Sequence, residues 1–144
     1  METKNILIID DDKILTRSMQ VILEEHQYSV DVANDAETGM EKFKSRKPDL
    51  LILDVMMSSE LEGHRLAHTI KSDPENKDLP ILVITGMKDA IGVNIRDAFE
   101  GIDELPSLVM MDKPFETEEL ISQVKDRTGI SLFPPLERIN SLIL

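Results

Sequence analysis

Reactive side chains recur at one kind of position in this sequence, directly after a short, mostly apolar run. With the runs that precede them, they are Asp10 and Asp11 after residues 6–9, Asp54 after 50–53, Thr85 after 81–84 and Lys113 after 108–112. Such runs are typical of strands buried on both faces of a parallel sheet, and ligands bind beyond the carboxyl ends of these strands. We therefore expect three carboxylates, one hydroxyl and one ammonium group in a single pocket. Such a set can hold a divalent cation and a phosphoryl group.

Patterns typical of strands and helices alternate along the chain. Strands are predicted near 5–10, 30–33, 49–53, 81–85 and 107–111, and helices near 13–26, from 34 to a point before 48, and near 62–72, 88–99 and 116–127. Asn34, with Glu37 three residues later, is the predicted N-cap of the second helix. Asp12 is interpreted as the cap of the first helix, and Gly129 is expected to end the last.

This alternation predicts an α/β fold, a doubly wound parallel sheet of five strands with helices on both faces, because the crossovers are right-handed. Val30 and Val32 alternate with Asp31 and Ala33, which is the pattern of a half-exposed strand at the edge of a sheet. We therefore predict the strand order 2-1-3-4-5. The pocket is then expected at the switch point between the first and third strands.

The composition is that of one small domain. The chain has 144 residues, of which 41% are hydrophobic and 31% charged, and its net charge is −12. A surface this acidic repels nucleic acid, so we expect no direct contact with DNA or RNA. No apolar stretch reaches the length of a membrane helix, no signal peptide is visible, and the chain has no cysteine. These features are compatible with the cytoplasmic location that we predict.

The motifs, taken in order, resemble those of the receiver domain of two-component response regulators, and the size is similar to that of the single-domain chemotaxis regulators. The motifs are Asp10-Asp11, Asp54 with Met57 three residues later, Thr85, and Lys113-Pro114-Phe115; the resemblance covers roughly residues 4–128. It implies a flavodoxin-like receiver domain at residues 1–128. The implied Mg²⁺ site consists of Asp11, Asp54, the main-chain carbonyl of Met56, and Asp10 acting through a water. Asp54 is the implied phosphoacceptor, with Thr85 and Lys113 contacting the phosphoryl oxygens.

The resemblance implies a phosphoaspartate switch in a two-component or phosphorelay system rather than an enzyme that turns over an external substrate. A histidine kinase or phosphotransfer protein would supply the phosphoryl group, and an unidentified protein would receive the signal. The alternative is an interaction module of the same fold that signals independently of phosphorylation. A Mg²⁺-dependent phosphohydrolase ranks last, because the aspartates after the first strand are not an Asp-x-Asp nucleophile–acid pair in the form that such an enzyme needs.

The chain departs from the family pattern at several positions. Ser58 stands where a proline is usual, and Met110 stands where a Tyr or Phe is common. The loop after Asp54 and the span from Thr85 to Lys113 are both longer than usual. The missing aromatic residue is the main support for the phosphorylation-independent alternative.

Residues 129–144 form a separate tail. Leu136, Ile139 and Ile143 lie at helical spacing after Pro135, which predicts a short amphipathic helix. Three roles stay open for it: packing on its own domain, contact with a second copy or a partner, or the start of an effector region.

Overall fold

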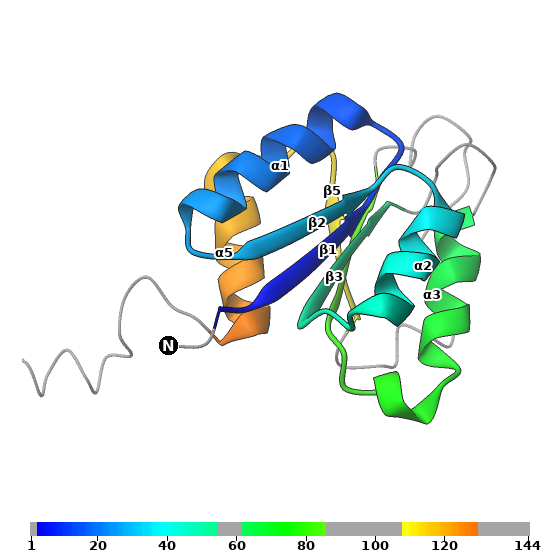
Figure 1. Cartoon of the computed structure of the whole chain (residues 1–144). Helices are drawn as coiled ribbons and strands as arrows, with labels where there is room; N and C mark the ends of the chain where they lie inside the picture. The colour runs from blue at the N-terminus through cyan, green and yellow to red at the C-terminus, as the bar shows by residue number, and fades with distance from the viewer. Residues whose placement is uncertain (1–2, 55–61, 86–107, 130–144) are drawn as a thin grey trace, which may run out of the picture.

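Five parallel strands form one sheet in the order β2-β1-β3-β4-β5, as predicted (Figure 1). The computed structural model describes residues 3–54, 62–85 and 108–129. The strands are β1 (Asn5–Ile9), β2 (Ser29–Ala33), β3 (Leu50–Asp54), β4 (Ile81–Thr85) and β5 (Leu108–Asp112). The helices are α1 (Lys13–Glu25), α2 (Ala36–Ser45), α3 (Glu62–Lys71), the 3₁₀ helix η1 (Pro74–Asn76) and α5 (Thr117–Thr128). The helix predicted near 88–99 and the tail from 130 onward lie outside the described residues.

Helices cover both faces of the sheet: α2 and α3 lie on one side, and α1 and α5 on the other (Figure 1). Alternate residues of a strand point to opposite faces, so each central strand contributes to two apolar clusters. One cluster joins Leu7 and Leu51 to the side of α2 and α3, and the other joins Ile8 and Ile52 to the side of α1 and α5. Burial on both faces explains why the sequences of β1 and β3 are almost wholly apolar. None of the described helices is both long and apolar enough to cross a bilayer.

The predicted N-cap of α1 and the predicted end of α5 at Gly129 are confirmed. The Asp12 carboxylate accepts hydrogen bonds from the N–H groups of Ile14 and Leu15, at 3.1 and 3.0 Å, and so caps α1. Gly129 ends α5 with a φ of 74°, in the left-handed conformation that glycine adopts without steric cost.

The predicted cap of α2 was wrong by one residue. Asp35, not Asn34, is the N-cap, and its carboxylate accepts hydrogen bonds from the N–H and the hydroxyl of Thr38 at 2.7 and 3.0 Å. Asn and Asp are about equally good caps, so two of them in succession leave the first helical residue ambiguous. The side chain of Asn34 instead donates a hydrogen bond to Asp10 O, in the turn between β1 and α1.

The turn after α1 offers a direct test of backbone strain. Gln27 has a φ of 73°, a conformation in which a side chain is disfavoured. Replacing Gln27 with glycine removes a steric cost of roughly 1 kcal/mol but adds freedom to the unfolded chain. We expect Gln27→Gly to raise the free energy of unfolding by about 0.5 kcal/mol in urea denaturation, whereas the control Gln27→Ala gains nothing. A lower stability for the glycine variant would contradict this account.

Candidate functional site

The register of the sheet brings the predicted reactive residues to one edge. Ile9 of β1 pairs with Leu53 of β3. Asp10 and Asp54, which come directly after these two residues, therefore lie at the ends of neighbouring strands. Thr85 pairs with Asp112 across β4 and β5, which places Lys113 one residue beyond the same edge. The side chain of Thr85 and the whole of Met56 lie outside the described part of the structure.

Three carboxylates meet at this edge. The ligand oxygens of Asp10, Asp11 and Asp54 all lie within 4.8 Å of one another. Asp10 is fully buried and Asp54 is 4% exposed, whereas Asp11 is exposed. Like charges at this spacing repel one another, and the repulsion is stronger where water is excluded.

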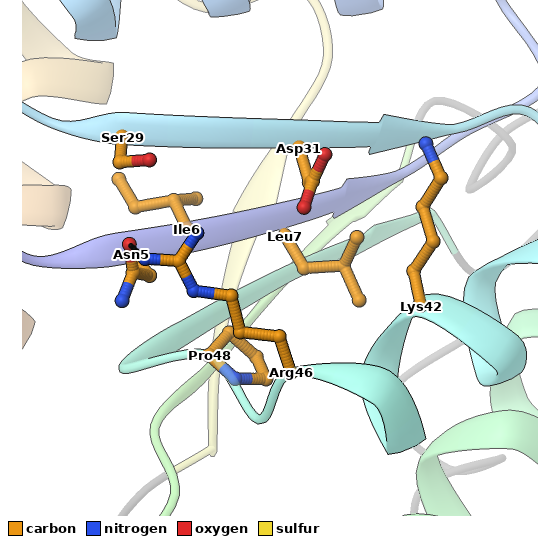
Figure 2. Close-up of a pocket in the computed structure, with 8 residues that line it drawn as sticks. All are labelled: Asn5, Ile6, Leu7, Ser29, Asp31, Lys42, Arg46 and Pro48. Carbon is orange, nitrogen blue, oxygen red and sulfur yellow. Dashed lines mark hydrogen bonds between the residues drawn. The ribbon is translucent and has the colours of Figure 1, made fainter.

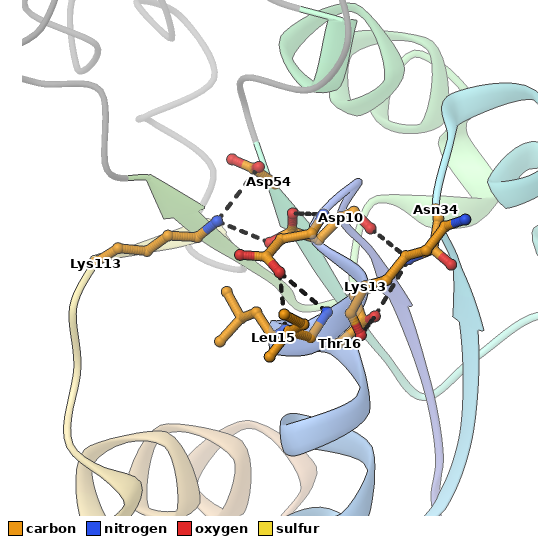
Figure 3. Close-up of polar contacts among 9 residues, drawn as sticks. Asp10, Lys13, Leu15, Thr16, Asn34, Asp54 and Lys113 are labelled. Carbon is orange, nitrogen blue, oxygen red and sulfur yellow. Dashed lines mark hydrogen bonds and ion pairs between the residues drawn. The ribbon is translucent and has the colours of Figure 1, made fainter.

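The Lys113 ammonium lies against two of these carboxylates (Figure 3). Its Nζ is 2.8 Å from Asp10 Oδ2 and 3.4 Å from Asp54 Oδ2. The pKa of Lys113 is raised above its ordinary value: burial alone would lower it, but the hydrogen bond to Asp10 and the charge of Asp54 outweigh burial. Lys113 is therefore a cation under all ordinary conditions. The peptide bond that joins it to Pro114 is cis.

The negative charge of Asp11 is compensated less than those of Asp10 and Asp54, which Lys113 contacts. Desolvation by the surrounding protein and the neighbouring charge of Asp10 raise the pKa of the Asp11 carboxyl above 3.8, although Lys113 acts in the opposite direction. A group in this situation favours either a proton or a nearby cation. The oxygen-only donor set suits Mg²⁺, which is a hard cation that often takes one or two carboxylates and keeps several waters. The residues present thus fit a Mg²⁺ site.

The backbone around Asp10 is held by neighbouring groups. The Asp10 N–H donates to Ala33 O at 3.1 Å, and the N–H of Asp12 donates to Asp10 Oδ1 at 3.0 Å. Asn34 Nδ2 donates to the main-chain oxygen of Asp10 at 2.8 Å and to Thr16 Oγ1 at 3.2 Å. Sequence reasoning missed Asn34 and Thr16 at this site. The one available signal was that two adjacent capping residues, of which only one is needed, precede α2.

Two hollows differ in size and in their place in the fold. One, of about 420 Å³, lies beside Lys113 and is walled by Leu15, Pro114 and Phe115. The other, between β1, β2 and α2, has about 10 Å³, room for roughly one water, and is partly lined by Asn5 and Arg46 (Figure 2). Arg46 donates to Asn5 Oδ1 at 2.7 Å across it. The smaller hollow is too small for a ligand, and the larger one adjoins Lys113 of the acidic edge. The site is therefore assigned to the acidic edge.

The comparisons with known proteins agree on one family. The model of the response regulator receiver domain matches residues 6–125. The response regulators MprA of Mycobacterium avium and Mycobacterium leprae are 33% and 34% identical to this chain over 120 residues, which are 83% of this chain and 49% of each relative. The chain therefore spans about half the length of the curated relatives it matches.

Solved structures show the same architecture. The receiver domain of a histidine kinase from Syntrophus aciditrophicus has a TM-score of 0.73 at 25% identity, over 93% of this chain and 97% of that one. A CheY-like receiver domain protein from Methanospirillum hungatei has a TM-score of 0.73 at 23% identity, over 89% and 95%, and shares the fold. Because the family model covers most of the sequence, the chain belongs to the response regulator receiver domain family, within two-component signalling.

Proposed function

We propose that this domain is a phosphoaspartate switch in which Asp54 accepts a phosphoryl group. The observation that carries the proposal is the position of the Asp54 carboxylate, in one pocket with two further carboxylates and the Lys113 ammonium. A carboxylate oxygen of Asp54 attacks the phosphorus of a phosphohistidine, the P–N bond breaks, and the imidazole leaves with its bonding electron pair. The product is an acyl phosphate on Asp54.

Each neighbouring group has a role that follows from its charge. When bound, Mg²⁺ neutralises the carboxylates and the charge on the transferring phosphoryl oxygens. Asp10, Asp11, Asp54 and the Met56 carbonyl would hold the cation. Lys113, already 3.4 Å from Asp54 Oδ2, is placed to contact a phosphoryl oxygen as a point charge. We assign Thr85 the other phosphoryl contact from its position at the end of β4.

We propose that a histidine kinase or phosphotransfer protein supplies the phosphoryl group. The apolar hollow beside Lys113 gives such a partner a place to dock, since Ile14 is 82% exposed near the same end of α1. We propose that the domain, residues 1–128, passes the signal on through contact with a downstream protein in the cytoplasm. A homodimer formed through the tail, residues 129–144, stays a prediction.

The domain catalyses only its own phosphorylation and slow dephosphorylation in this proposal. The alternative, signalling by binding alone, is not favoured. A module that signals by binding alone does not need three carboxylates and an ammonium group in one pocket. Such a cluster lowers the stability of the fold unless its charges are compensated.

Phosphorylation is tested by intact mass after incubation with a small phosphodonor and Mg²⁺. We expect the wild type to gain the mass of one phosphoryl group and Asp54→Asn to gain none, since the amide cannot act as the nucleophile. Asp12→Asn is the matched control: it also removes a carboxylate near the site, but asparagine still caps α1, so it should be phosphorylated. An unchanged wild-type mass with donor and Mg²⁺ in excess would exclude the switch.

Metal binding is tested by thermal unfolding in increasing Mg²⁺. A cation that binds only the folded state stabilises it by about 1.4 kcal/mol at ten times Kd. We expect the thermal midpoint of the wild type to rise with Mg²⁺, and Asp11→Ala, an exposed position, to fold normally but lose most of the rise. A wild-type midpoint that does not respond to millimolar Mg²⁺ would show that the carboxylates do not form this site.

The ion pair is tested by a double-mutant cycle in urea. Lys113→Met keeps the apolar stem but leaves the buried Asp10 carboxylate without its cation, so we expect a loss of about 2 kcal/mol or more in the free energy of unfolding. The double variant Asp10→Asn with Lys113→Met should lose less than the sum of the single variants, because the two side chains are coupled. Additive losses would mean that the 2.8 Å contact contributes no coupling energy.

A further inference from the structure

Asn34 connects two turns that the sequence alone does not link. The residue lies between β2 and α2, and its side-chain amide donates to Asp10 O at 2.8 Å and to Thr16 Oγ1 at 3.2 Å (Figure 3). Thr16 is 2% exposed, and its hydroxyl in turn donates to Lys13 O at 3.1 Å. One amide thus joins the turn before α2 to the turn before α1 and to the first turn of that helix.

The carbonyl that accepts from Asn34 belongs to the peptide group between Asp10 and Asp11. Asp10 is fixed independently, by Ala33 O at its N–H and by Lys113 at its carboxylate. The Asp11 carboxylate accepts a hydrogen bond from its own N–H, which belongs to this same peptide group, so the orientation of the peptide group governs where the carboxylate lies. A hydrogen bond to the peptide oxygen therefore acts on Asp11 more than on Asp10.

We infer that Asn34 is a positioning residue for the cation site, which holds the Asp10–Asp11 peptide group so that the Asp11 carboxylate faces Asp10 and Asp54. The inference rests on the proposed function, because it concerns the affinity of the same site for Mg²⁺. Asn34 carries no charge, so its contribution is geometric: removing it leaves the net charge of the pocket unchanged but frees the peptide group to rotate.

Asn34 is not needed as the N-cap of α2. Asp35 caps α2 through two hydrogen bonds to Thr38, so loss of the Asn34 amide leaves the helix cap in place. This separates the two adjacent residues experimentally. Asp35 contributes to the stability of α2, and Asn34 contributes to the geometry of the acidic pocket.

The test compares Asn34→Ala with Asp35→Ala as the matched control. The dissociation constant for Mg²⁺ is measured by calorimetric titration well below the melting temperature, and the rate of phosphorylation by a small phosphodonor is measured against Mg²⁺ concentration. Groups that orient metal ligands typically change metal affinity 10- to 100-fold. We expect Asn34→Ala to weaken Mg²⁺ binding about tenfold and to recover nearly the wild-type rate at saturating Mg²⁺. Asp35→Ala should melt at a lower temperature but bind Mg²⁺ as the wild type does.

Thr16→Val provides a second variant of similar volume. It removes one acceptor of the Asn34 amide but leaves the bond to Asp10, so we expect a smaller loss of Mg²⁺ affinity than for Asn34→Ala. Wild-type affinity in Asn34→Ala would overturn the inference. Equal losses of affinity in Asn34→Ala and Asp35→Ala would also overturn it, because they would indicate a general loosening of the turn. A wild type that binds no Mg²⁺ would instead overturn the proposed function and the inference together.

Discussion

Electrostatic repulsion among three clustered carboxylates is the constraint around which this domain is built. The oxygens of Asp10, Asp11 and Asp54 lie within 4.8 Å of one another, and two of these residues are buried. Burial removes the water that would otherwise screen their charges. The Lys113 ammonium, which contacts Asp10 and Asp54, compensates much of this cost. The raised pKa of Lys113 is the reciprocal effect of the carboxylates on the lysine.

Such a cluster requires a rigid support, and the sheet supplies it. Lys113 and Asp10 are 103 positions apart in the chain and meet only because β1, β3 and β5 end at the same edge. The residues of β1 and β3 that precede the carboxylates are almost fully buried, with helices on both faces. Small displacements in a close-packed interior are costly, so the strand ends hold their spacing although the charges repel. Burial of the central strands and placement of the charges are thus two consequences of one sheet.

Features that depend on the pattern of apolar and polar residues could be predicted from the sequence. Features that depend on individual hydrogen bonds could not. Strand order followed from the polar alternation of β2, and the clustering of Asp10, Asp54 and Lys113 followed from their places after apolar runs. The cap of α2 was assigned to Asn34 because Asn and Asp have similar capping propensity. Only the structure shows that Asp35 bonds to Thr38 while Asn34 reaches Asp10. The 3₁₀ helix η1 and the cis bond before Pro114 depend on local geometry that no periodicity signals.

Asp10 and Asp11 are identical neighbours with different environments, and the difference comes from the end of β1. Asp10 continues the ladder, donating its N–H to Ala33 O, and is therefore buried and bonded to Lys113. Asp11 lies beyond the last ladder bond and is exposed, with a raised pKa. In the structure the charge of Asp10 is already compensated by protein groups, whereas that of Asp11 is compensated less. A cation bound in the pocket would therefore gain most from Asp11, and its affinity would depend on the peptide group that orients this residue.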